Sequence, residues 1–216
     1  MFVTAGHDEL VQLAGTTGTM VTTVSPAVLA AMAETVTPQG VLGVASLLDV
    51  PLEQALAGSP ALVAVLDRVA DPGNAGTVIR TADAAGADAV VLAGDSVDPH
   101  NGKCVRSTAG SLWHLPVVSG APLHLVLALA RDRGLQVLAT TGGAADDLEE
   151  LLDEGVLAAP TLWVFGSEAH GLPAGALSAA DRRVRVPMYG QAESLNLASA
   201  AAVCLYASAR ARRVLQ

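Results

Sequence analysis

The sequence predicts an α/β fold built on a parallel sheet with helices on both faces. From residue 61 onward, short apolar runs of strand length alternate with segments of helix length, a pattern typical of parallel sheets. Hydrophobic residues make up 51% of the 216 residues and charged residues 15%, which suffices for a packed core. No apolar run approaches the roughly 20 residues of a membrane span. Without a secretory signal, and with two distant cysteines, Cys104 and Cys204, we expect a soluble, cytoplasmic protein.

The first sixty residues predict a small region of its own. Ser25 followed by Pro26 is typical of a helix start with proline at the first helical position. We expect a helix over 27–33, a short strand at 40–45 and a helical connector over 47–60. The connector ends in Gly-Ser-Pro, which marks a boundary.

The larger region opens with a buried strand and a helix. The run 61–66 is apolar and ends at Asp67, as a buried strand would. After a Pro-Gly-Asn turn, Asn74 is predicted to cap a helix over 75–85 that stops at Gly86. Further strands are expected at 89–92, 115–118, 136–140, 161–165 and 183–186, and further helices at 105–112, 123–133 and 198–209.

The last helix is preceded by a polar turn. A strand-like segment breaks at a proline and a glycine, and the chain reopens as a helix at Ser194. The break places the Glu193 carboxylate, the Ser194 hydroxyl and the Asn196 amide around one turn, the usual makings of a polar ligand site. The helix over 198–209 is nearly all small or apolar, so it must be buried against the sheet or a second subunit.

Three segments carry motifs that are specific in combination. Residues 74–82 read Asn-Ala-Gly-Thr-Val-Ile-Arg-Thr-Ala, residues 165–172 read Phe-Gly-Ser-Glu-Ala-His-Gly-Leu, and Val-Pro-Met at 186–188 is followed by Glu-Ser-Leu-Asn at 193–196. In this order they resemble the three motifs of the SpoU/TrmH family of RNA ribose 2′-O-methyltransferases, within the SPOUT superfamily. The resemblance implies an S-adenosylmethionine-dependent enzyme that methylates a ribose 2′-hydroxyl in structured RNA, with rRNA favoured over tRNA.

The resemblance also implies an architecture. Residues 59–216 would form a SPOUT-type parallel sheet with a C-terminal trefoil knot. Residues 1–58 would form a partial, truncated L30e-like α/β domain that binds substrate, with its linker. By this resemblance the first domain is too short, because its usual basic helix and first strand are absent. A homodimer is implied as well, with the last helix and the first-motif helix at a two-fold interface.

The implied cofactor positions follow three predicted strands, at the strand ends where ligands bind in open α/β sheets. The glycines at 142, 166 and 190 would allow close backbone approach and φ values that other residues avoid. By resemblance, the residues that bind S-adenosylmethionine are Thr140, Thr141, Gly142, Gly166, Glu168, Val186, Pro187, Met188, Ser194 and Leu195.

Arg80 is the position that the family pattern marks as catalytic. A guanidinium stays protonated in proteins, so besides general base we consider that Arg80 binds the target phosphate and stabilises the developing alkoxide. Arg80 and Arg106 are expected to contact RNA, and His170 is a loop histidine that offers another base. The residues expected to orient Arg80 are Asn74, Glu168, Ser194 and Asn196.

The charge balance leaves an alternative open. RNA binding draws on Lys and Arg, yet the chain has a formal net charge of −9 and a single lysine, and no positive residue precedes Arg68. A non-catalytic RNA-binding protein on the same fold is therefore the alternative. A nicotinamide enzyme fits poorly, because the segment 73–76 lacks the Gly-x-Gly-x-x-Gly spacing.

Two charged stretches are read as helix surface. The acidic run 146–154 has helical spacing and predicts a solvated face. Arg210, Arg212 and Arg213 are typical of the charged end of a helix, with an RNA-facing role as the alternative. The sequence indicates no metal site.

Overall fold

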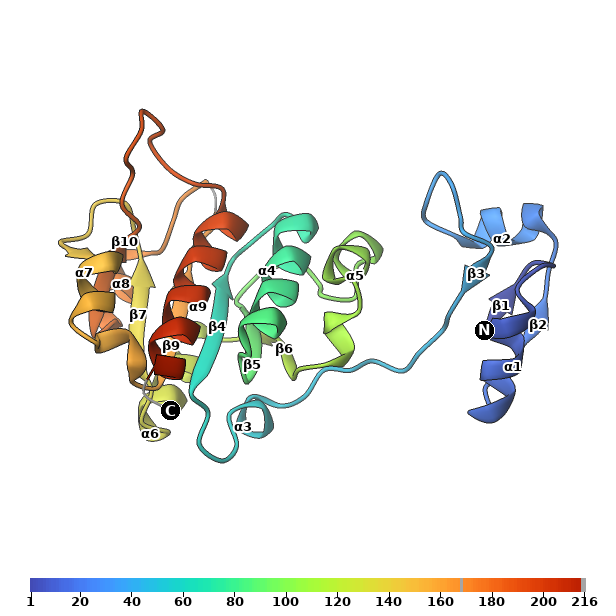
Figure 1. Ribbon diagram of the computed structural model, residues 1–216, viewed down its shortest axis with the longest axis horizontal. Coiled ribbons are helices and arrows are strands. Elements are labelled where there is room, and N and C mark those ends of the chain that lie inside the picture. Colours follow the sequence, from blue (N-terminus) through green and yellow to red (C-terminus); the bar gives the residue numbers. More distant parts are fainter. Residues whose placement is uncertain (168, 215–216) are drawn as a thin grey trace. The chain divides into compact units, whose positions relative to one another are not determined.

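The computed structural model of the 216-residue chain describes residues 1–167 and 169–214 (Figure 1). The chain divides into two compact units, Met1–Leu47 and Leu48–Gln216. The predicted division at residues 58 and 59 stays a prediction, as does the derivation of the first unit from a truncated L30e-like domain. Among the described residues, no helix is long and apolar enough to cross a membrane.

The first unit is a small sheet with two helices. The strand order is β2-β1-β3, with β1 parallel to β2 and antiparallel to β3. The predicted helix start at Pro26 is confirmed, because the Ser25 side chain accepts a hydrogen bond from the Val28 backbone N–H at 3.3 Å. The elements are β1 (Phe2–Val3), α1 (Asp8–Thr16), β2 (Thr22–Thr23), α2 (Pro26–Met32) and β3 (Val41–Leu42).

The second unit contains a seven-stranded sheet in which every pair of neighbouring strands is parallel, which confirms the predicted fold class. The order is β6-β5-β4-β9-β7-β10-β8. Two strands have the predicted bounds, and the two-residue strand β8 is not predicted. The strands are β4 (Leu62–Asp67), β5 (Ala89–Ala93), β6 (Val117–Ala121), β7 (Gln136–Thr140), β8 (Asp146–Asp147), β9 (Thr161–Phe165) and β10 (Arg182–Arg185).

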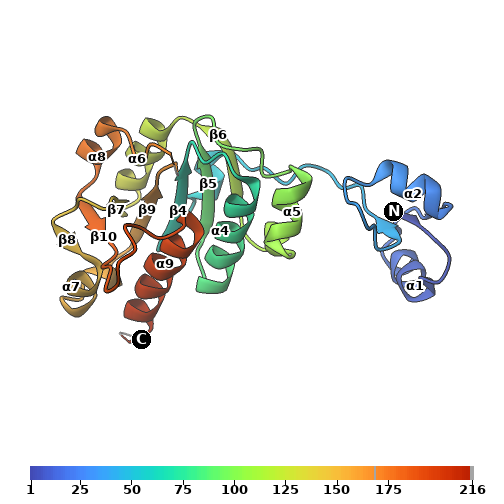
Figure 2. The same ribbon diagram turned by 90° about the horizontal axis from the view of Figure 1, so that it is seen from above.

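Helices cover both faces of this sheet (Figure 2). Successive strand residues point to opposite faces, so Leu66 packs in one core with Trp163 while Val65 packs in the other with Val126. One face carries α4 (Pro72–Ala85), α5 (Gly102–Thr108), α7 (Leu148–Asp153) and α9 (Leu197–Val214), and the other α3 (Leu52–Ala55), α6 (Leu123–Asp132) and α8 (Ala174–Ala179). Two 3₁₀ turns, η1 (Ser111–Trp113) and η2 (Val156–Ala158), complete the unit.

Helix α4 begins earlier than predicted. The expected N-cap, Asn74, is wrong, because the Asp71 carboxylate caps the helix and accepts a hydrogen bond from the Gly73 backbone N–H at 2.5 Å. Lys103 and that backbone N–H lower the pKa of Asp71. The Pro-Gly-Asn segment is therefore the first helical turn. The end is as predicted, since Gly86 has a left-handed φ of 72°.

The acidic run is only in part a solvated face. Its helix, α7, exposes Glu149, Glu150 and Asp153. Asp147 is buried instead, lies 3.0 Å from Arg185 in an ion pair, and caps α7 by accepting the Glu149 backbone N–H at 2.9 Å. The sequence prediction is wrong for Asp147 because its partner lies on a strand that is distant in sequence.

Helix α9 is buried on one side. Ala198, Ala201 and Leu205 lie in the core with the sheet, and the buried Trp163 indole N–H donates to the Ser208 hydroxyl at 2.9 Å. The sheet thus accounts for the inner face of this helix. Its outer face carries Val203 and Tyr206, which are 43% and 52% exposed.

Candidate functional site

A pocket of about 520 Å³ opens at the carboxyl ends of β7, β9 and β10. Its volume lies in the range of roughly 300 to 1,000 Å³ that is usual for small-molecule sites. Strands β9, β7 and β10 are parallel neighbours, so their following loops meet at one edge of the sheet. The lining residues are Thr140, Thr141, Gly142, Phe165, Gly166, Ser167, Gly171, Val184, Val186, Met188, Glu193, Ser194, Leu195, Asn196, Leu197 and Ala200.

Most of the predicted cofactor positions line this pocket. They come from the ends of β7, β9 and β10 and the loops that follow them, which the fold brings to one place, whereas no residue of the first motif segment, 74–82, lines the pocket. Pro187 does not line it, although both of its neighbours do, and Glu168 lies outside the described residues. The residues missed are Phe165, Gly171, Val184, Leu197 and Ala200. Phe165 and Gly171 stand inside the second motif segment, which could have found them, whereas Ala200 had no such signal.

Gly166 allows two backbone segments to touch. A Cβ at this position would lie 2.4 Å from the carbonyl carbon of Gly171 and 2.5 Å from the backbone nitrogen of Leu172. No side chain fits there. The expectation of unusual φ values is wrong for Gly142, Gly166 and Gly190, since none has a positive φ. Gly171 takes that conformation instead, with a φ of 60°.

Asn196 connects the polar turn to helix α4. Its side-chain oxygen accepts hydrogen bonds from the backbone N–H groups of Ala198, at 2.9 Å, and Ser199, at 3.4 Å, as an N-cap does. Its side-chain nitrogen donates to the Asn74 side-chain oxygen at 3.1 Å. The fold thus brings together two residues that the sequence predicts to act together, although 122 positions separate them.

Arg80 lies away from the pocket of its own chain. It is exposed on α4, about 9 Å along the helix axis from Asn74 at 1.5 Å per residue. Ser194 lines the pocket, but Arg80 does not. Within the described part of the chain Arg80 makes no hydrogen bond or ion pair, so the expected orienting contacts from Asn74, Ser194 and Asn196 are not present in the single chain. His170 is also exposed and outside the lining.

Arg106 lies on α5, which packs closely on α4. A Cβ on Gly76 would lie 2.4 Å from the Cys104 carbonyl oxygen and 2.6 Å from the Ser107 Cβ. Only glycine permits this approach of the two helices. Arg80 and Arg106 are therefore exposed cations on adjoining helices.

Free positive charge is concentrated on a few elements. Of the 12 Lys and Arg residues, five form ion pairs: Arg68, Lys103, Arg131, Arg182 and Arg185. The remainder have no carboxylate partner among the residues that the structure describes. They are Arg80 and Arg106, Arg133 and Arg183, and the group Arg210, Arg212 and Arg213 at the end of α9. The acidic chain thus keeps unpaired guanidinium groups on α4, α5 and α9.

Two family models match the chain. The model of the SpoU rRNA Methylase family matches residues 61–206. A model described as RNA 2′-O ribose methyltransferase substrate binding matches residues 1–50. Together they cover both compact units.

Curated relatives and solved structures agree. An uncharacterised tRNA/rRNA methyltransferase of Synechocystis is 41% identical over 87% of this chain and 66% of its own. The 23S rRNA (guanosine(2553)-2′-O)-methyltransferase RlmP of Bacillus subtilis is 40% identical over 82% and 67%. The chain thus spans about two thirds of these relatives. The crystal structure of the SpoU methyltransferase AviRb from Streptomyces viridochromogenes with AdoMet has a TM-score of 0.86 at 29% identity, covering 100% of this chain and 83% of that one.

Proposed function

The chain belongs to the SpoU rRNA methylase family, and we propose that it transfers a methyl group from S-adenosylmethionine to the 2′-hydroxyl of a ribose in structured RNA. The convergence of the second and third motif segments with residues 140–142 on one pocket carries this proposal. The names of several relatives specify 2′-O-methylation of 23S rRNA, which favours rRNA over tRNA as the substrate.

The residues of the pocket fit S-adenosylmethionine, which when bound supplies a methyl group on a sulfonium. Val186, Met188 and Leu195 offer apolar contact and backbone hydrogen bonds to an adenine. Gly166 leaves no side chain where the loops approach. Thr140, Thr141, Gly142 and Ser194 add polar groups to the same pocket, and Pro187 restricts the chain between two lining residues.

Arg80 would act on the RNA. Because its guanidinium remains protonated, we favour binding of the target phosphate and stabilisation of the developing alkoxide, with the proton leaving to phosphate or water. Alignment of the reacting groups would supply much of the acceleration. Arg106, on the adjoining helix, would hold a second phosphate. In this scheme Asn74, Ser194 and Asn196 position the helix and the turn, with Glu168 in the same role by resemblance.

A homodimer would bring Arg80 to a cofactor pocket. Its position outside its own chain's pocket supports an arrangement in which Arg80 of one subunit serves the site of the other. The outer face of α9, with Val203 and Tyr206 exposed, supports the interface. A substitution that tests the interface must leave the core of the chain intact, and Ala201 of α9 is buried in that core. We therefore choose Tyr206, on the exposed face of α9. Tyr206→Glu should yield a folded monomer without transfer activity. Sedimentation showing monomeric, active wild-type protein would refute the dimer.

A trefoil knot would account for the sheet order. Strand β10 lies between β7 and β8, which are consecutive in sequence and joined by residues 141–145. Because β10 lies between two strands that are joined directly in sequence, the sheet order supports a chain that passes through the loop joining β7 to β8. We also propose that the first unit binds RNA, consistent with the family model that matches it, and that the enzyme acts in the cytoplasm.

The test combines cofactor binding with transfer. The full-length protein should bind S-adenosylhomocysteine without RNA and restore a missing ribose methyl group to rRNA from cells lacking it, as mass mapping would detect. Arg80→Ala and Arg80→Lys should both remove transfer and leave cofactor affinity within a few fold, because Lys keeps the charge and loses the planar fork. RNA binding without cofactor binding would establish the alternative, a non-catalytic RNA-binding protein.

A further inference from the structure

One wall of the pocket is an exposed loop, residues 186–196, here called the cofactor loop. Four of its residues from 193 to 196 line the pocket, as do Val186 and Met188. Its two ends are held by side chains. Arg185, just before the loop, pairs with the buried Asp147 at 3.0 Å, and Asn196, at its end, donates to Asn74 at 3.1 Å.

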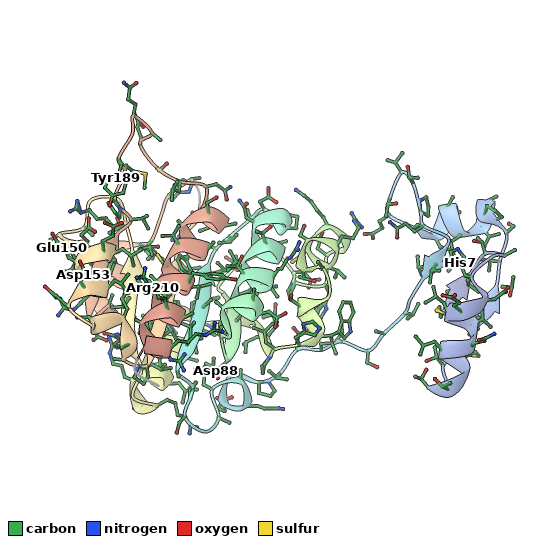
Figure 3. The ribbon with its side chains drawn as sticks, viewed as in Figure 1. His7, Asp88, Glu150, Asp153, Tyr189 and Arg210 are labelled. Carbon is green, nitrogen blue, oxygen red and sulfur yellow. The ribbon has the colours of Figure 1, made fainter. Side chains whose placement is uncertain are left out.

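Between these two ends, one side-chain hydrogen bond to another described residue holds the loop. The Tyr189 hydroxyl donates a hydrogen bond to Oε2 of Glu149, on helix α7. Figure 3 shows Tyr189 in the loop on the side of α7, the helix that carries Glu150 and Asp153. Residues 186–195 make no other hydrogen bond within the part of the chain that the structure describes.

The physical chemistry indicates that this hydrogen bond, rather than burial, fixes Tyr189. The residue is 80% exposed, so its ring gains little from burial. The acceptor is a carboxylate, which forms stronger hydrogen bonds than neutral groups do. The hydrogen bond to Glu149 is the main cause that raises the pKa of Tyr189 to about 12, so the phenol keeps the proton that it donates. Helix α7 is itself anchored, because Asp147 caps it and pairs with Arg185.

We propose that Tyr189 and Glu149 are a positioning pair that holds the cofactor loop in the conformation that binds S-adenosylmethionine. The proposal rests on the proposed function, which assigns the pocket to that cofactor. Met188, the neighbour of Tyr189, lines the pocket, so freedom at Tyr189 is transmitted directly to the pocket wall. Neither residue lines the pocket, so we expect their effect on cofactor affinity and not on the transfer step.

The test uses variants that remove one partner at a time. Tyr189→Phe removes the hydroxyl alone, and Glu149→Ala removes the acceptor. The Kd for S-adenosylhomocysteine, measured by calorimetry on the full-length protein, should rise about three- to tenfold in each, as expected for the net loss of one solvent-exposed hydrogen bond. The double variant should be no weaker than the weaker single variant. Glu150→Ala, an exposed neighbour on α7, should leave the Kd unchanged.

Two further readouts separate positioning from a general structural role. Both variants should stay folded without cofactor, with at most a small fall in melting temperature, and should keep the wild-type kcat at saturating cofactor, while hydrogen exchange in residues 186–196 becomes faster. Wild-type affinity in Tyr189→Phe, or additive losses in the double variant, would overturn the pair. If the wild-type protein itself fails to bind the cofactor, the proposed function fails instead, so the two failures are distinguishable.

Discussion

Two walls of the pocket, those that follow β9 and β10, are held in place by different kinds of contact. The wall that follows β9 is held by backbone contact, since Gly166 lies directly against Gly171 and Leu172. The wall that follows β10 is exposed and is attached by side chains at Asp147, Glu149 and Asn74. Close contact between two backbone segments leaves no room for an added atom. Separate side-chain contacts, by contrast, can be removed one at a time, and each removal weakens the attachment only in part. We therefore expect all-or-none effects on the first wall and graded effects on the second.

The largest effect should come from Gly166→Val. Any Cβ there overlaps backbone atoms of the opposing strand of the loop, so the loop must move. Cofactor binding should be lost, and the free energy of unfolding should fall by about 1–3 kcal/mol, as for overpacking elsewhere. Calorimetric titration and chemical denaturation measure both. Gly143→Ala is the matched control, because a Cβ on Gly143 meets no atom within 4 Å and Gly143 does not line the pocket, and near-native binding is expected for it. Equal losses in both variants would abolish the contrast between the walls.

The next largest effect, a loss of stability, is expected at the ion pair between Arg185 and Asp147. Asp147→Asn keeps an oxygen that can cap α7 but removes the charge facing Arg185, whose side chain is 39% exposed. We expect the free energy of unfolding to fall by about 1–2 kcal/mol, less than for a fully buried pair. Asp153→Asn, on the same helix and exposed, should change it little. A stability equal to wild type in Asp147→Asn would mean that the ion pair does not hold this edge of the sheet.

A smaller effect, on cofactor affinity alone, is expected at the hydrogen bond between Asn196 and Asn74. Asn196→Asp keeps the acceptor that caps α9 and removes the donor to Asn74. Stability should hold while the Kd for the cofactor rises by about three- to tenfold, the cost of one hydrogen bond. Asn101→Asp is the control, because Asn101 also caps a helix, α5, through its side-chain oxygen. If both variants bind cofactor as tightly as wild type, the contact between Asn196 and Asn74 has no part in shaping the pocket.

The smallest effect is a change in titration. The pKa of Tyr189 is raised to about 12, chiefly by its hydrogen bond to Glu149. The neutral phenol is thus favoured by folding, and this contribution is present below the ordinary pKa of about 10 and disappears as the pH rises through about 12. In a Tyr206→Phe background, phenolate absorbance reports Tyr189 alone, since the chain has two tyrosines. Adding Glu149→Ala should return the pKa toward its ordinary value; an unchanged titration would refute the hydrogen bond.

Sequence patterns that act locally predicted much of the fold. Strands β7 and β9 have the predicted bounds, because short apolar runs between turn residues have few other structures open to them. Helix α4 ends at Gly86 as predicted, since glycine readily takes the left-handed conformation that ends a helix. The family resemblance also predicted that the loops after β7, β9 and β10 meet, and parallel strands do end at one edge of the sheet.

Only the tertiary structure decided which residues pair across the chain. The N-cap of α4 went to Asp71 rather than Asn74, which left the Asn74 side chain to meet Asn196. Asp147 is buried because Arg185 lies on the adjacent strand, and no local pattern separates it from its exposed acidic neighbours. The small residues of α9 did not reveal which side faces the core, since helical spacing defines faces only when large and polar residues alternate. The sequence alone thus determined elements and motifs, whose signals are local, whereas partners distant along the chain depended on how the sheet was ordered.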